Sequence, residues 1–206
     1  MVSRRNMLKT GLTAVFGACA VQTASASEVQ QKSQNNFDVV ILGAGTGGLV
    51  TAIEAADLGL KPVVLEKMEC SAGNSLYASG GIAAWGTSQQ KEEGRNETKE
   101  SFREDMMKVS EYRDDPALVG AYVNHIPEDF EWLKKQGVKF SKIGKKPWPL
   151  NYRMHNVDGQ GLTGGARLVR YLLEACEKRN IPIIYNTKAI ELLTNDAGRV
   201  IGVRAQ

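Results

Sequence analysis

Residues 39–50 read VVILGAGTGGLV, an apolar run that enters a cluster of glycines and leaves it apolar again. The Val- and Ile-rich residues 37–42 are typical of a strand that is buried on both faces of a parallel sheet. Residues 47–58 have the apolar spacing of a helix that Gly59 ends, and residues 62–65 are a second apolar run. The order of strand, helix and strand predicts a β-α-β unit with a right-handed crossover, and therefore an α/β fold.

Three of these glycines, Gly43, Gly45 and Gly48, follow the spacing G-x-G-x-x-G at the junction of strand and helix. The first glycine allows a tight turn, the second lets a pyrophosphate approach the backbone, and the third lets the helix pack close to the strand. The free N–H groups of the helix N-terminus favour a diphosphate. Glu66 ends the second strand, 18 residues beyond Gly48, and can accept hydrogen bonds from a ribose diol. We therefore predict a dinucleotide site on a Rossmann-like parallel sheet, with Gly47 also in the turn; these residues alone do not distinguish FAD from NAD.

The remaining patterns extend this α/β reading to residue 206. They predict helices at residues 100–110, 115–125, 127–136 and 164–178, a strand at 181–185, and a hairpin of 189–193 with 200–204. Pro127 is expected to interrupt the helix that begins at Asp115-Pro116, because a proline cannot donate a backbone hydrogen bond. One domain over residues 37–206 accounts for all these elements.

Residues 1–26 have the composition of a targeting segment, with a basic head, a short apolar stretch and the small residues ASA at positions 24–26. The stretch SRRNMLK at residues 3–9 resembles the twin-arginine export signature. That route carries folded cargo, which suits a protein that binds its cofactor before export, so we expect a periplasmic location. An ordinary secretory signal is the alternative. The apolar stretch is too short to span a bilayer, so no transmembrane helix is expected. Residues 27–36 are polar and aperiodic, as in a linker.

Charge and cysteine content exclude several classes of function. The net charge of +3 comes from Arg4, Arg5 and Lys9, so the rest of the chain offers no electrostatic case for binding nucleic acid. No C-x-x-C or C-x-x-C-H pattern is present, which argues against a covalent c-type haem and against a zinc ribbon. No metal site is predicted. Cys70 and Cys176 are interpreted as small apolar residues.

The stretch EKMECSAGNSLYASGGI at residues 66–82 resembles the fumarate reductase/succinate dehydrogenase flavoprotein family, in its FAD-binding domain 2. The acid followed by Lys67, the G-N-S loop and the S-G-G segment carry this resemblance, and TGG at residues 163–165 and TKA at 187–189 extend it. It implies FAD as the cofactor, with a flavin that lies along glycine backbone. The cofactor-binding residues that it adds are Lys67, Asn74, Ser75, Ser79, Gly80, Gly81 and Ala189.

The resemblance also implies a way of working. Asn74 stands where membrane-complex members carry a histidine bonded to the flavin, which implies non-covalent FAD, as in the soluble flavocytochrome c-like branch. The implied reaction transfers a hydride from FAD N5 to the double bond of a small carboxylate acceptor, with electrons from a separate haem or quinol-linked donor. A dehydrogenase of the same family, working in the oxidising direction, is an alternative. Arg153 and His155 are interpreted either as loop hydrogen-bonding residues or as neighbours of the substrate side.

The family's capping domain and later segments, which carry its substrate-binding and proton-donating residues, would follow Gln206. No catalytic residue is therefore assigned. On this interpretation the FAD-binding domain is incomplete at its C-terminus, as a truncated gene, a split subunit or a partial record. An inactive truncated remnant is the alternative that is not an enzyme.

Overall fold

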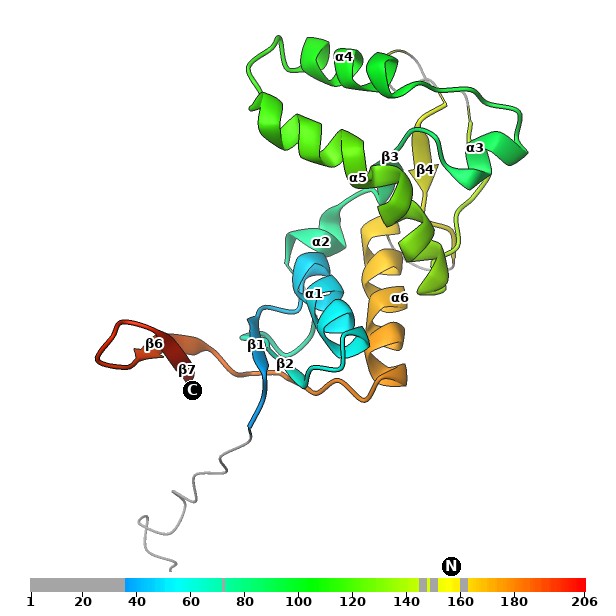
Figure 1. The fold of residues 1–206 in the computed structure, drawn as a ribbon. Coiled ribbons are helices and arrows are strands. Elements are labelled where there is room, and N and C mark those ends of the chain that lie inside the picture. The colour runs from blue at the N-terminus through cyan, green and yellow to red at the C-terminus, as the bar shows by residue number, and fades with distance from the viewer. Residues whose placement is uncertain (1–35, 72, 145–147, 149–151, 160–162) are drawn as a thin grey trace, which may run out of the picture. The chain divides into compact units, whose positions relative to one another are not determined.

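The structure is a computed structural model that describes residues 36–206 except 72, 145–147, 149–151 and 160–162 (Figure 1). The export signal expected at residues 1–26 lies outside the described residues, as does the linker up to residue 35. Residues 37–206 form one compact unit. Its elements are β1 (Val39–Leu42), α1 (Thr46–Asp57), β2 (Pro62–Leu65), α2 (Asn74–Tyr77), β3 (Gly81–Ala83), α3 (Ser88–Glu92), α4 (Lys99–Val109), α5 (Pro116–Lys135), β4 (Met154–Asn156), α6 (Gly164–Lys178), β5 (Ile183–Ile184), β6 (Ala189–Thr194) and β7 (Val200–Ala205).

Strands β1, β2 and β5 form a parallel sheet in the order β1-β2-β5, and helices α1 and α6 pack on it. This arrangement confirms the predicted α/β class. Strand β2 lies between the other two strands: its Val63 is opposite Val40 of β1, and its Val64 is opposite Ile183 of β5. Helix α1 crosses between β1 and β2 and ends where Gly59, at φ +81°, donates its N–H to the Ala56 oxygen at 2.9 Å. Glycine reaches this left-handed conformation without a Cβ penalty, as the sequence indicated.

Strand β1 is buried on one face only, so the expectation of burial on both faces was wrong. Ile41 is 8% exposed, whereas Val40 and Leu42 on the opposite face are 37% and 50% exposed. Helices α1 and α6 lie side by side over the face that Ile41 lines (Figure 1). No other described element buries the second face.

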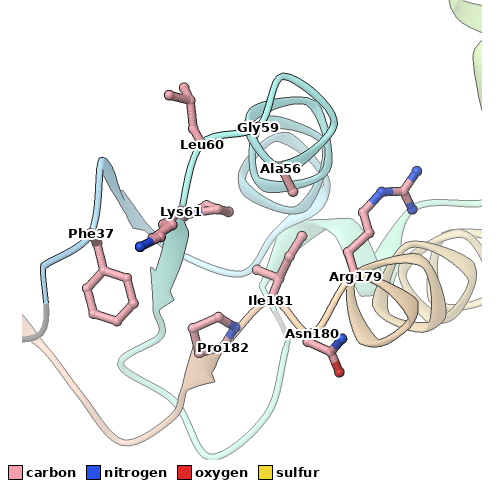
Figure 2. A pocket seen from close by; sticks show the side chains of 10 residues that line it. Phe37, Ala56, Gly59, Leu60, Lys61, Arg179, Asn180, Ile181 and Pro182 are labelled. Carbon is pink, nitrogen blue, oxygen red and sulfur yellow. The ribbon is translucent and has the colours of Figure 1, made fainter.

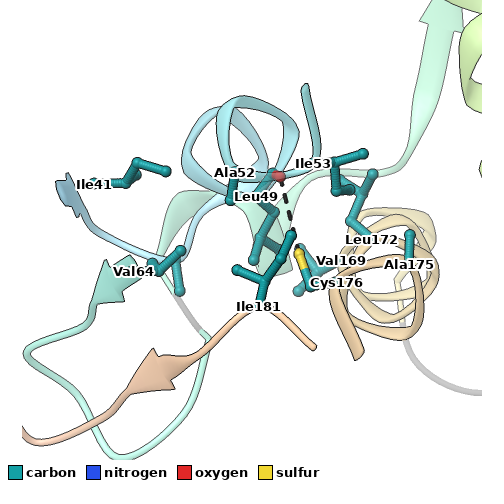
Figure 3. Close-up of a cluster of buried hydrophobic side chains, with 11 residues drawn as sticks. Ile41, Leu49, Ala52, Ile53, Val64, Val169, Leu172, Ala175, Cys176 and Ile181 are labelled. Carbon is teal, nitrogen blue, oxygen red and sulfur yellow. Dashed lines mark hydrogen bonds between the residues drawn. The ribbon is translucent and has the colours of Figure 1, made fainter. Parts of the chain in front are cut away.

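The main core lies between the sheet and helices α1 and α6 (Figure 3). Leu49 and Ile53 of α1 meet Leu172 and Cys176 of α6, and all four side chains are fully or almost fully buried. Burial raises the pKa of the Cys176 thiol to about 11, and its Sγ lies 3.9 Å from the Leu49 oxygen. Cys176 is therefore the apolar residue that we predicted. Cys70 is exposed, which corrects the same prediction for that residue.

Helix α5 runs without interruption through Pro127, where we predicted a break. Because proline has no N–H, the carbonyl oxygen four residues earlier, on Val123, lacks a partner within the helix. The indole Nε1 of Trp85 donates to that oxygen at 2.8 Å. The prediction was wrong because the replacing hydrogen bond comes from a distant side chain, which the local sequence does not reveal.

A second group of elements, from α2 to β4, lies between β2 and α6 in the sequence. Strands β3 and β4 pair antiparallel, and we call them the β3–β4 ribbon; neither strand was predicted. Phe102 of α4 and Val123 of α5 are buried in a separate core beside this ribbon. Hairpin β6–β7 was predicted; among the strands of the described residues its two strands pair only with each other, and it projects from the sheet (Figure 1).

Helix α6 has the bounds that the sequence predicted, and Thr163 caps its N-terminus by accepting a hydrogen bond from Ala166 N at 3.2 Å.

Among the helices of the described residues, none combines the length and the apolar character that a membrane crossing requires.

Candidate functional site

The glycine turn between β1 and α1 has the geometry that a dinucleotide motif requires. Gly43 takes φ +100°, which side chains disfavour. A Cβ on Gly48 would lie 2.0 Å from the Gly43 oxygen, so only glycine lets the helix approach the strand this closely. Gly45 is the N-cap of α1 in extended conformation, and no side chain of its own caps the helix. The N-cap of α1 therefore adds no side chain of its own to the turn.

Glu66 is fixed beside this turn. Its side chain is 7% exposed, and its two carboxylate oxygens accept hydrogen bonds from different backbone groups. Oε2 accepts from Ala44 N at 2.7 Å, and Oε1 accepts from Met68 N at 2.9 Å. Each oxygen has a further lone pair, so the carboxylate is oriented and can still accept from two adjacent hydroxyls.

A cavity of about 350 Å³ opens at the carboxyl ends of β1 and β2. Gly43, Glu66, Lys67 and Ala189 all line it, although Ala189 is more than a hundred residues from the others in sequence. The N–H of Thr187 donates to the backbone carbonyl oxygen of Glu66 at 2.8 Å. This bond holds the segment that contains Ala189 against the end of β2. The structure therefore brings these four predicted residues together.

Ser75 contacts the first residue of α1, next to the glycine turn. Its Oγ lies 2.8 Å from Thr46 Oγ1 and 3.2 Å from Thr46 N, the first amide of α1. Asn74 begins the short helix α2 and is exposed. The contact reveals Thr46 as a site residue that the sequence analysis missed. Its place directly after Gly45, in the first turn of the helix, was the signal that could have identified it.

The flavin-side glycines have close protein neighbours. A Cβ on Gly80, which takes φ +80°, would lie 2.1 Å from the Gly164 carbonyl carbon, and one on Gly81 would lie 2.3 Å from Met154 Sδ. Gly80 is thus required for packing against backbone whether or not a ligand is bound, whereas at Gly81 the obstacle is the flexible end of the Met154 side chain. Ser79 is exposed and its oxygen lies against Gly164. Contact of this segment with flavin stays a prediction.

Arg153 and His155 are both buried away from the glycine turn. The Arg153 guanidinium forms ion pairs with Glu97 and Asp105, each at 2.7 Å, and is 3% exposed. The His155 ring is fully buried and bonds Thr87. Of the two interpretations that the sequence allowed, the structure supports hydrogen-bonding residues within the protein.

A larger cavity, of about 490 Å³, lies at the amino ends of the strands (Figure 2). Phe37, Lys61 and Pro182 border it together with Arg179, whose Nε donates to Asp57 Oδ1 at 2.6 Å. Ligands of open parallel sheets bind at the carboxyl ends, next to the helix N-termini. The smaller cavity is therefore the candidate cofactor site. Within the described ranges, no group of three His, Cys, Asp or Glu residues is arranged to hold a metal ion.

The family model described as FAD binding domain matches residues 38–206. The chain belongs to this FAD-binding family. Over 169 residues it is 36% identical to a fumarate reductase (cytochrome) of Shewanella frigidimarina, and the match covers 82% of this chain and 29% of that protein. The chain therefore spans less than a third of the length of this curated relative. The resemblance to fumarate reductase flavoproteins and the prediction of FAD are confirmed.

Two solved structures share the fold of this FAD-binding domain. The 3-ketosteroid-delta4-(5alpha)-dehydrogenase of Rhodococcus jostii RHA1 superposes with a TM-score of 0.74 at 26% identity, over 85% of this chain and 44% of that one. The open conformation of a flavocytochrome c3 fumarate reductase superposes with a TM-score of 0.72 at 27% identity, over 82% of this chain and 30% of that one. Both likenesses confirm the predicted fold class.

The residues present fit FAD. A Cβ on Gly45 would meet nothing within 4 Å except Ser75 Oγ at 3.5 Å, so the turn leaves room for a diphosphate at the α1 N-terminus. The oriented carboxylate of Glu66 lies where a ribose diol can donate to it, and the cavity beyond it reaches Ala189. Bare amides, an oriented acid and an adjoining cavity follow one another in the order of diphosphate, ribose and adenine.

Proposed function

We propose that this chain is the FAD-binding part of an exported flavoprotein oxidoreductase that resembles fumarate reductase and acts on the double bond of a small carboxylate. The observation that carries the proposal is the joint position of Gly43, Glu66 and Ala189 at one cavity beside the α1 N-terminus. The 36% identity to a fumarate reductase (cytochrome) supports the substrate class.

In this proposal the residues divide the cofactor among them. The N–H groups that follow Thr46 in the first turn of α1 bind the diphosphate, and the Thr46 and Ser75 hydroxyls adjust to its oxygens. Glu66 holds the ribose, and the backbone at Ala189 contacts adenine. When bound and reduced by the electron donor, FAD would supply the redox chemistry, with a hydride from its N5 for one carbon of the acceptor double bond while the other carbon takes up a proton. The flavin is held without a covalent bond, because the amide of Asn74 is not a nucleophile.

A second candidate is a dehydrogenase that works in the oxidising direction. The observation that favours it is the likeness to the Rhodococcus dehydrogenase, at a TM-score of 0.74. The two directions differ in which flavin state reacts, so the two half-reactions separate them. Anaerobically reduced protein that is reoxidised by fumarate supports the reductase. Oxidised protein that is bleached by a 3-ketosteroid supports the dehydrogenase.

We further propose that the electrons come from a separate haem or quinol-linked donor, because a flavin that reduces its acceptor must itself be reduced again. Residues 1–206 carry no C-x-x-C-H motif for a covalent haem. Export through the twin-arginine route rests on the pair Arg4 and Arg5. Replacing both arginines with lysine keeps the charge and is expected to retain the protein in the cytoplasm. Unchanged periplasmic recovery of the double variant would instead indicate the general secretory route.

The test of FAD binding uses the whole reading frame that contains this chain. Purified protein is expected to show the visible absorption band of oxidised flavin. Gly45→Val places a branched side chain where the diphosphate lies and should abolish flavin retention. Gly120→Val is the control, because Gly120 lies in α5 with open space around its Cβ position. A folded, colourless wild-type protein, or equal flavin content in the two variants, would contradict the proposal.

A further inference from the structure

The β3–β4 ribbon carries the flavin-side glycines. Gly81 is paired with Asn156, and Ile82 with His155. The N–H of Val157 extends the pairing by donating to the Gly80 oxygen at 3.0 Å. The position of residues 80 and 81 therefore depends on how firmly β4 is held.

His155 is the buried titratable side chain of this ribbon. Its Nδ1 lies 2.7 Å from the Arg153 oxygen, which also accepts from Ala84 N on the β3 side at 2.9 Å. A second carbonyl oxygen, that of Ile82, lies 3.3 Å from Nδ1. Carbonyl oxygens only accept hydrogen bonds, so Nδ1 carries the proton. Through Nδ1 the ring contacts backbone of both strands of the ribbon and stabilises their pairing.

The other ring nitrogen connects the ribbon to α3. Nε2 of His155 lies 2.9 Å from Thr87 Oγ1. Thr87 is the N-cap of α3, and its Oγ1 accepts from Gln90 N at 3.1 Å. With Nδ1 protonated, neutral Nε2 accepts the hydroxyl proton of Thr87. One neutral ring thus joins β3, β4 and the α3 cap.

The surroundings favour the neutral ring. The ring packs against Phe130 at 4.5 Å between centroids and against Phe140 at 6.4 Å. Burial lowers the pKa of His155 below its ordinary value, although the backbone acceptors and the charges of Glu93 and Glu131 act in the opposite direction.

The charged groups around the ring come from three elements. Glu93 follows α3, Glu131 lies on α5, and Arg153 lies beside β4, paired with Glu97 and Asp105. Strand β3 has no charged side chain.

We propose that His155 is a positioning residue for the flavin side of the site, which holds Gly80 and Gly81 in place through the β3–β4 ribbon only while its ring is neutral. Protonation turns Nε2 from an acceptor into a donor. The Thr87 hydroxyl proton then loses its acceptor, Thr87 Oγ1 has to accept from both Nε2 and Gln90 N, and a charge enters an aromatic pocket. The ribbon then loosens and FAD is released. This inference rests on the proposed function, because it assumes that flavin lies along residues 80 and 81.

The test measures FAD affinity from pH 8 to pH 5 by flavin fluorescence, on the whole reading frame. Wild-type affinity is expected to fall as the pH is lowered through the pKa of His155, which burial holds below its ordinary value. A fall of about tenfold would correspond to a difference of one pKa unit between FAD-bound and free protein. His155→Asn retains a donor at the position of Nδ1 and cannot titrate in this range, so its affinity should vary far less with pH. His125 is present in both proteins, so a difference between them reports on His155.

Hydrogen exchange at amides 80–84 gives a second readout that does not depend on enzyme activity. After correction for intrinsic rates, protection in the wild type should fall as the pH decreases, and His155→Asn should lack this change. Parallel pH profiles of the two proteins overturn this inference and leave FAD binding intact. Wild-type protein that binds no FAD at pH 8 overturns the proposed function together with it.

Discussion

Gly47 and Gly48 are neighbours in the first turn of α1, yet an added methyl group has a different effect at each. At position 48 the new Cβ would lie 2.0 Å from the Gly43 oxygen and 3.4 Å from Ile41 Cγ2, whereas at position 47 it meets nothing within 4 Å. Contacts under 3.0 Å do not occur, so Gly48→Ala must shift the helix or the Gly43 carbonyl by about 1 Å. Overpacking of this kind costs about 1–3 kcal/mol, whereas alanine in a helix is favoured over glycine by about 0.5–1 kcal/mol.

Urea unfolding and FAD titration of the two variants test this reasoning. Gly48→Ala is expected to lower the free energy of unfolding by about 1–3 kcal/mol and to weaken FAD binding by at least about tenfold, because the amides of α1 move away from the diphosphate. Gly47→Ala should be as stable as the wild type or slightly more stable. Equal unfolding free energies and equal FAD affinities in the two variants would refute the close approach of α1 to Gly43.

Two further predictions concern other parts of the fold. Trp85→Phe should cost about 1–3 kcal/mol in urea unfolding, because the Val123 oxygen loses its donor. The cost should shrink in a Pro127→Ala background, where residue 127 can donate to that oxygen, and additive costs would contradict the replacement. With a pKa of about 11, Cys176 is about 0.1% thiolate at pH 8, so iodoacetamide should label Cys70 and leave Cys176 unmodified until the chain unfolds, as peptide mapping can measure. Rapid labelling of Cys176 in the folded protein would show that α6 does not bury it.

The sequence was sufficient to predict those elements whose ends are set by residues within or next to the element. Helix α6 was predicted with its observed bounds from its apolar spacing. Its Thr163 cap, seen in the structure, also lies within the element's own sequence. The β6–β7 hairpin followed from its turn, in which Asn195 Oδ1 accepts from Ala197 N at 3.1 Å and Gly198 takes φ +74°. In both elements the contacts that set the cap or the turn are close in sequence.

Elements that depend on distant partners could not be predicted in this way. Strands β3 and β4 are each three residues long, too short for a period of two to be recognised. The continuity of α5 depends on Trp85, and the exposed face of β1 depends on which elements cover the sheet. For the same reason the sequence suggested the glycines of the site and missed the Thr46–Ser75 contact, which joins segments 29 residues apart.

The pairing of β2 with β5 sets a delay during synthesis. Val64 pairs with Ile183, about 120 residues later, and the buried side chains of α1 await α6, which lies just before β5. At about 5–20 residues per second, a ribosome needs about 6–24 s to make the intervening chain. For that interval the nascent glycine turn stands on a two-stranded sheet with one uncovered helix, so chaperones have their longest access to this protein before its nucleotide cradle is complete.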